Sequence, residues 1–212
     1  GFTSIIFISQ FLLLFSCKSS INEPKPQVSS LISSTSKTVE LNSWAIEPRQ
    51  RIESWVKEIT DSASPKFIPV SDRIAVFDND GTLWPEQPLP TQAVFAVEYL
   101  KAVAHQHPEF QKDPVLKGIL SGDLEPMKKE GSRGILKMMN ASHNGQTEET
   151  FKTAVRQWID TARDEKFNKL YKEVIYLPMM ELLDYLRSND FKTFIVSGGG
   201  ADFMRVWSEE AY

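Results

Sequence analysis

Most apolar residues after position 41 recur at helical spacing. In residues 43–60 the large apolar side chains lie mainly on one side of a helix, namely Trp44, Ile52, Trp55, Val56 and Ile59. This pattern is typical of an amphipathic helix. Residues 91–104 and 147–171 show the same spacing, so we expect helices in all three segments.

Two short runs are instead rich in β-branched and aromatic residues. RIAVF at 73–77 is followed by Asp-Asn-Asp-Gly, and FKTFIV at 191–196 is followed by Ser-Gly-Gly-Gly. Apolar runs that end in turn residues predict buried strands. Pro178 suits the first turn of a helix before the second run, and Asn189-Asp190 ends that helix. The order helix, strand, glycine-rich turn and helix predicts an α/β fold with a parallel sheet.

The first 40 residues have a different composition. Residues 2–16 form an apolar run that is too short and too interrupted for a membrane span, and it resembles the hydrophobic part of a secretory signal. Leu14-Phe15-Ser16-Cys17 resembles a bacterial lipobox, in which Cys17 is lipidated, although Phe15 is unusual there. The alternatives are an ordinary signal peptide and a buried apolar segment. We expect residues 1–17 to be a signal and residues 18–40, rich in Ser, Pro, Lys and Thr, to be a flexible tether.

Composition narrows the class of function. The chain has 212 residues and a formal net charge of -4, which allows one domain with an insertion but shows no basic face for nucleic acid. One cysteine cannot form an internal disulfide, and no Cys/His spacing indicates zinc.

Candidate site residues follow each predicted strand directly. Asp78 and Asp80 lie two residues apart at a strand end, where ligands of open α/β sheets bind. Two neighbouring carboxylates need a shared proton or cation, and Mg²⁺ would supply the cation. Ser197 and Gly198 offer a hydroxyl and a backbone N–H at a helix start, which together form a candidate anion site. Each motif alone is also compatible with an ordinary turn.

Both motifs resemble those of the haloacid dehalogenase superfamily. FDNDGTLW at 77–84 resembles the first motif and IVSGGG at 195–200 the second, while residues 176–205 look like phosphoserine-phosphatase-like and acid-phosphatase-like members. The resemblance covers about residues 70–212. It implies a Rossmann-like core with a parallel sheet and a mostly helical cap inserted after the first motif. The core is expected to start at 41–84 and to continue at 176–212, with the cap at 85–175.

The resemblance also implies a chemistry. Asp78 would be the nucleophile that forms an aspartyl-phosphate, and Asp80 the general acid and base. The Asp78 carboxylate and the Asp80 main-chain carbonyl would bind Mg²⁺, while Ser197 and Gly198 would bind the phosphoryl group. Asp80 argues against a dehalogenase, because that branch usually lacks the second acid. A phosphate-steadying Lys or Arg and a further acidic metal motif are expected beyond Tyr212, so we expect the chain to be truncated.

Together these patterns predict a Mg²⁺-dependent phosphatase that acts on a small phosphomonoester. We expect it to be exported to the bacterial periplasm or cell envelope, with a lipid anchor at Cys17 as its contact with the membrane and no nucleic-acid partner. A phosphotransferase of the same superfamily and a non-catalytic surface lipoprotein are the alternatives. Trp84 is a further candidate for a substrate-facing or a packing role, and Glu86 for a substrate-facing role or a solvated position. We also consider a substrate contact or simple exposure for Arg133, helix-end roles for His105 and His107, and core packing for Met138 and Met139.

Overall fold

The computed structural model describes residues 39–212. The predictions made for residues 1–17, for Cys17 and for almost all of the 18–40 tether concern residues outside this range. No helix within residues 39–212 is both long enough and apolar enough to cross a membrane. The elements in chain order are α1 (Ile46–Thr60), η1 (Val70–Asp72), β1 (Ile74–Phe77), α2 (Thr91–Val103), η2 (Ala104–Gln106), η3 (Pro108–Lys112), α3 (Pro114–Ser121), α4 (Glu125–Glu130), α5 (Ser132–His143), α6 (Glu148–Ile159), η4 (Tyr171–Glu173), α7 (Leu177–Ser188), β2 (Lys192–Ile195), α8 (Ala201–Met204) and α9 (Ser208–Ala211).

The two predicted strands are neighbours in one parallel sheet. Ile74 pairs with Lys192, and Phe77 pairs with Ile195. The ladder extends one step further, since the Val196 N–H donates to the Phe77 carbonyl at 2.8 Å. Within residues 39–212 the sheet has these two strands. An α/β fold with parallel strands is therefore confirmed.

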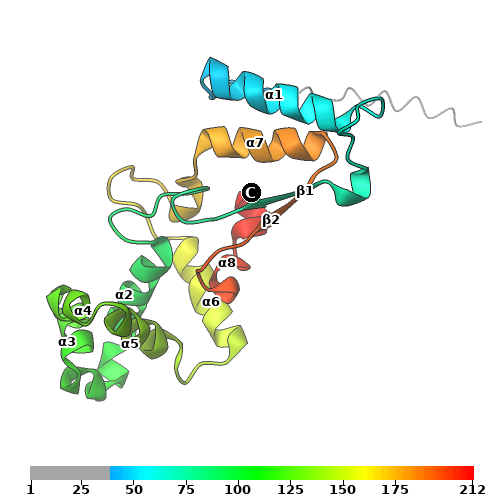
Figure 1. The fold of residues 1–212 in the computed structure, drawn as a ribbon. Coiled ribbons are helices and arrows are strands. Elements are labelled where there is room, and N and C mark those ends of the chain that lie inside the picture. Colours follow the sequence, from blue (N-terminus) through cyan, green and yellow to red (C-terminus); the bar gives the residue numbers. More distant parts are fainter. Residues whose placement is uncertain (1–38) are drawn as a thin grey trace, which may run out of the picture. The chain divides into compact units, whose positions relative to one another are not determined.

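One face of this sheet packs against helices, and the other is exposed. Ala75 and Phe77 pack into a cluster with buried residues of α1, α7 and the turn before β2, namely Val56, Ile59, Leu186 and Phe191. Figure 1 shows α1 and α7 on the same side of the strands. On the opposite face Val76 is 57% exposed and Phe194 is 50% exposed. The prediction of buried strands was therefore wrong, because one face is only partly buried and nothing within the described part of the chain covers the other.

Helices α2 to α6 occupy the chain between the two strands, and both strands run toward them (Figure 1). Their buried residues belong to two clusters. One joins α2 to α5, and consists of Ala96, Leu100, Phe110, Val115, Ile119, Met127 and Met138. The other joins the first motif, α2, α6 and the segment after the second motif, and consists of Trp84, Phe95, Phe151, Val155, Ile159, Phe203 and Trp207. The second cluster therefore links both motifs to the inserted helices.

Three predicted helices differ from the structure in extent. The helix predicted over 147–171 ends at Ile159, and Asn168 has a left-handed φ of 52°, which a helix does not accommodate. The helix predicted over 43–60 begins at Ile46, so Trp44 lies before it. Trp55 is half exposed rather than part of the buried stripe. The helix predicted over 91–104 ends one residue earlier and continues as the 3₁₀ turn η2.

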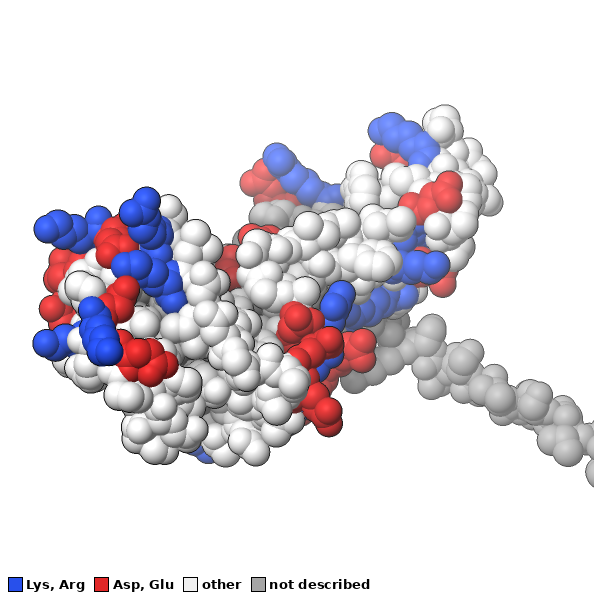
Figure 2. All heavy atoms as spheres, turned by 90° about the horizontal axis from the view of Figure 1, so that it is seen from below, with Lys and Arg blue, Asp and Glu red and all other residues white. Residues whose placement is uncertain are grey.

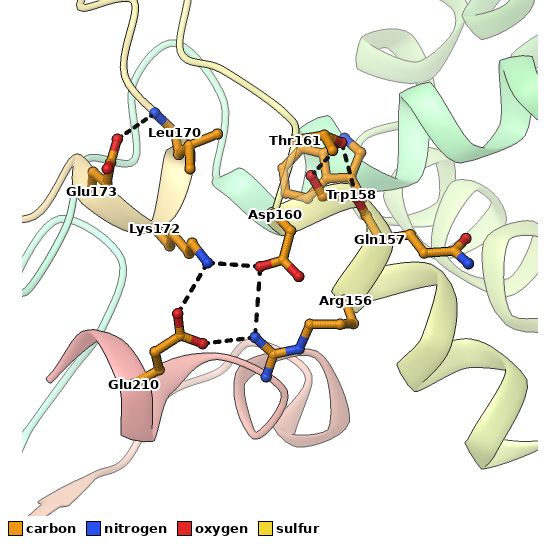
Figure 3. Close-up of polar contacts among 9 residues, drawn as sticks. All are labelled: Arg156, Gln157, Trp158, Asp160, Thr161, Leu170, Lys172, Glu173 and Glu210. Carbon is orange, nitrogen blue, oxygen red and sulfur yellow. Dashed lines mark hydrogen bonds and ion pairs between the residues drawn. The ribbon is translucent and has the colours of Figure 1, made fainter.

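A four-residue ion network fixes the end of the described chain against α6 (Figure 3). The Lys172 ammonium lies 2.7 Å from Asp160 and 3.0 Å from Glu210, and Arg156 lies 2.9 Å from Glu210. The hydrogen bond from Lys172 is the main cause that lowers the pKa of Asp160 and of Glu210. The network joins α6, η4 and α9, and so supports the segment that follows the second motif.

Candidate active site

The strand register places the two motifs at the same edge of the sheet. Asp78 follows Phe77 and Ser197 follows Val196, and these two preceding residues are hydrogen-bonded across the strands. Side chains at the carboxyl ends of neighbouring parallel strands lie close together. The structure thus brings together two motifs that are far apart in the sequence.

The first motif folds into a closed turn immediately after β1. The Asn79 carbonyl accepts hydrogen bonds from Leu83 N at 2.8 Å and Thr82 N at 3.1 Å, and Gly81 N donates to the Trp84 carbonyl at 2.8 Å. Gly81 has a φ of +72°, a backbone conformation that residues other than glycine rarely adopt. A Cβ at this position would also lie 2.9 Å from Cδ of Glu86. The backbone conformation therefore favours glycine here, and a larger residue would also displace the Glu86 carboxylate.

Trp84 positions the second acid of the motif. Its indole N–H donates to Oδ1 of Asp80 at 2.9 Å. The Trp84 side chain is 1% exposed and stacks on Trp207, with ring centroids 4.0 Å apart. The other oxygen of Asp80, Oδ2, lies 3.6 Å from where a Cβ on Gly199 would be. Trp84 is therefore packed in the core and also directs the Asp80 carboxylate toward the second motif.

Buried Asn79 links the two acids to the last residue of the chain. Its backbone N–H donates to Oδ1 of Asp78 at 2.8 Å, and its side-chain oxygen accepts from the Tyr212 hydroxyl at 2.8 Å. Burial raises the pKa of Tyr212, and the nearby charge of Asp80 raises it further, so the hydroxyl stays protonated and donates. Sequence reasoning missed both Asn79 and Tyr212. For Asn79, the only sequence feature that could have indicated a role was its position as a polar residue between two acids.

The second motif is held by its own serine and by α2. The Ser197 hydroxyl oxygen accepts from Gly199 N at 3.1 Å, and Gly200 N donates to Oε1 of Gln92 at 2.7 Å. A Cβ on Gly200 would lie 2.5 Å from the Gln92 amide nitrogen, so glycine is needed for this approach. Gln92 is 9% exposed, and no local pattern in the sequence indicated its role.

Both motifs line a cavity of about 690 Å³ together with α5. The two motifs contribute to this lining the four residues that the sequence predicted, namely Asp78, Asp80, Ser197 and Gly198. The remaining lining residues are Glu86, Pro90, Gln92, Ala93, Ile135, Met138, Met139, Asn140, His143, Gly199 and Gly200. The structure therefore places all four predicted residues, and Glu86, around one space.

Other candidates lie elsewhere or differ from expectation. Arg133 is exposed and does not line the cavity. His105 Nδ1 lies 3.0 Å from the Ala102 carbonyl, which fits its predicted role at a helix end, and His107 pairs with Glu109 at 2.8 Å. Met138 is buried as predicted, but Met139 faces the cavity as well as the α2–α5 core.

The oxygen donors of the first motif fit part of a magnesium site. The Asp80 carbonyl accepts no hydrogen bond from residues 39–212, and the Asp78 side chain is exposed toward the cavity. Mg²⁺ commonly binds one or two protein oxygens and completes its shell with water and substrate phosphate. The described residues contain no group of three His, Cys, Asp or Glu side chains that could hold a metal ion. The donor set is therefore compatible with Mg²⁺ but is not a complete cage.

Comparison with known proteins agrees with this geometry. The family described as haloacid dehalogenase-like hydrolase matches residues 75–212, which begin within β1 and include both motifs. No curated protein matches the chain. The match spans more than half of the 212 residues, and within it two acids and a serine meet at the ends of parallel strands. The chain therefore belongs to the haloacid dehalogenase-like hydrolases.

Proposed function

We propose that this hydrolase is a Mg²⁺-dependent phosphatase that acts on a small phosphomonoester through an aspartyl-phosphate. One observation carries the proposal: Asp78, Asp80 and Ser197 line a single cavity at the carboxyl ends of two paired parallel strands. We assign the protein to the phosphoserine-phosphatase-like and acid-phosphatase-like branch, with α2 to α6 as a cap over the site. The cavity wall supplied by α5 supports this assignment.

Asp78 carries the first step of the proposed reaction. Its Oδ1 accepts the Asn79 N–H, so we assign the attack on phosphorus to Oδ2. The bond between phosphorus and the alcohol oxygen breaks, and that oxygen takes a proton from Asp80. In the second step Asp80 accepts a proton from a water molecule whose oxygen attacks phosphorus. Phosphate leaves and the Asp78 carboxylate is restored.

Donors around the cavity would hold the phosphoryl group in place. The Ser197 oxygen already accepts a hydrogen bond from Gly199, which leaves its proton free to be donated to a phosphate oxygen. The Gly198 N–H would provide a second donor. Mg²⁺ bound by the Asp78 carboxylate and the Asp80 carbonyl would neutralise part of the phosphate charge.

Charge on the described surface favours a small substrate over a nucleic acid. On the face seen in Figure 2, Lys and Arg are interspersed with Asp and Glu, and no continuous basic track crosses it. Binding to a nucleic-acid backbone requires clustered positive charge.

We also propose export and a lipid anchor at Cys17, which rest on the sequence pattern of residues 2–17.

The test is release of phosphate from a generic aryl phosphate by the product of the complete gene, with and without Mg²⁺. The expected result is activity that requires Mg²⁺ and falls at least about a thousandfold in Asp78→Asn, which removes the nucleophile but keeps the shape of the side chain. Asp184→Asn is the matched control, since its carboxylate lies on α7 with 59% side-chain exposure and does not line the cavity. Activity that persists in Asp78→Asn would refute the assigned nucleophile, and a folded protein without activity would refute the phosphatase.

A further inference from the structure

One stripe of residues on helix α5 packs against neighbouring elements. Gly134, Met138 and Ser142 recur every four positions and are buried. A Cβ on Gly134 would lie 2.3 Å from the Met127 carbonyl oxygen, so the backbones of α4 and α5 touch here. Met138 and Ser142 are 1% and 0% exposed, so this packed stripe determines which other residues of α5 remain accessible.

The adjacent stripe of α5 forms a wall of the cavity. Ile135, Met139 and His143 each follow a residue of the buried stripe and all line the cavity, as does Asn140. Ile135 is 51% exposed, although it is a large apolar side chain. A ligand in the cavity would cover apolar surface that is otherwise in contact with water. This wall therefore suits the carbon chain of a substrate better than its phosphate.

His143 adds one oriented polar group to this wall. Its Nδ1 lies 2.7 Å from the Met139 carbonyl, which can only accept, and 3.0 Å from the Ser142 hydroxyl, which donates to that same carbonyl. We therefore assign the ring proton to Nδ1. The ring also stacks on Phe151 with centroids 4.3 Å apart. In the neutral ring Nε2 is then an acceptor, and it has no hydrogen-bond partner within residues 39–212. His143 therefore offers an acceptor to a ligand that donates.

No Lys or Arg among the described residues lines the cavity. Three carboxylates line it, those of Asp78, Asp80 and Glu86. The proposed chemistry uses Asp78 and Asp80 and leaves Glu86 without a role. The Glu86 carboxylate lies against Gly81, beside the turn that carries the two acids. A negatively charged leaving group would meet no described cationic side chain other than a protonated His143.

We infer that the alcohol part of the substrate is a short amino alcohol, which carries an ammonium group and no carboxylate or second phosphate. This inference rests on the proposed phosphatase activity. The Glu86 carboxylate and Nε2 of His143 accept hydrogen bonds from the ammonium, and Ile135 and Met139 contact the carbon chain. Phosphoserine is disfavoured, because its carboxylate would lie near the Glu86 carboxylate, and no described Lys or Arg lines the cavity to pair with it.

The test compares kcat/KM for two small substrates of opposite charge. Phosphoethanolamine carries an ammonium, and phosphoglycolate carries a carboxylate. We expect phosphoethanolamine to be preferred by roughly threefold or more, because the exposed Glu86 carboxylate attracts an ammonium and repels a carboxylate, and each such contact between exposed charges contributes a few-fold factor. Ile135→Lys places a cation in the wall at a half-exposed position, so it should reverse or abolish the preference without unfolding the protein. Ile135→Met, which adds no charge, should retain it.

An aryl phosphate measured in parallel separates the two proposals. Hydrolysis of the aryl phosphate with equal or better use of phosphoglycolate would overturn the amino-alcohol inference alone. An unchanged preference in Ile135→Lys would overturn it too. Loss of activity toward all three compounds in the folded protein would overturn the phosphatase proposal, and this inference with it.

Discussion

Trp84 combines packing and hydrogen bonding at the candidate active site, and Trp84→Phe separates them. Phenylalanine can still stack on Trp207, which lies 4.0 Å away, but it cannot donate to Oδ1 of Asp80. A hydrogen bond to a charged group contributes about 1.5–3 kcal/mol. If this energy holds Asp80 in its productive orientation, kcat falls roughly ten- to hundredfold while KM changes little.

Trp207→Phe is the matched control for this change. It removes the same kind of ring from the other side of the stack, but the Trp207 indole nitrogen is buried without a hydrogen-bond partner in the described residues. Loss of an unpaired buried N–H relieves a cost of about 1–3 kcal/mol and offsets some of the lost packing. We expect Trp207→Phe to keep kcat within about threefold of the wild type, since it breaks no bond to Asp80.

Steady-state kinetics with the aryl phosphate and thermal unfolding of both variants form the assay. Thermal unfolding shows how much packing each variant loses, so that kcat can be compared between variants of known stability. The reasoning is refuted if Trp84→Phe retains the wild-type kcat. It is also refuted if Trp207→Phe lowers kcat as much as Trp84→Phe does, because general loosening of the stack would then explain both.

Two further predictions concern the turn of the first motif and the ion network. Gly81→Ala should lower both the stability and the activity of the protein. Gly122→Ala is the control, because Gly122 has a similar φ of +84° but open space around the added Cβ, and it should lower stability by about 1 kcal/mol and leave activity unchanged. Equal activity of the two variants would contradict the role of the Glu86 contact. Lys172→Met should lower Tm by roughly 1–3 °C near neutral pH. The pKa values of Asp160 and Glu210 are lowered from 3.8 and 4.5, so the stabilisation by their ion pairs with Lys172 is present above those values and is lost as the pH falls below them. A Tm difference between Lys172→Met and the wild type that persists at about pH 3 would contradict this prediction.

Local features of the chain were predictable from the sequence. The strands at 73–77 and 191–196, the helix opened by Pro178 and the two turns that follow the strands all appear within a residue or two of their expected positions. These features depend on neighbouring residues, because proline, glycine and β-branched side chains restrict the backbone where they stand. Helix 147–171 was overextended because its spacing continued into a polar segment with a left-handed residue.

Contacts between distant segments were not predictable in the same way. Gln92 holds Gly200 across 108 residues, and Tyr212 holds Asn79 across 133. His143 reaches the cavity because a neighbouring stripe of α5 is packed against α4. No local signal distinguishes Gln92 and His143 from other polar residues on amphipathic helices.

The sequence by itself determined the chemistry at each strand end, namely two acids after one strand and a serine with glycines after the other. The tertiary structure decided that these strands pair in parallel, that Trp84 directs Asp80 toward the second motif, and that α5 closes one side of the cavity. It also decided that one face of the strands is exposed. The physical reason is that motif chemistry lies in consecutive residues, whereas pairing and burial depend on how elements more than 100 residues apart pack together.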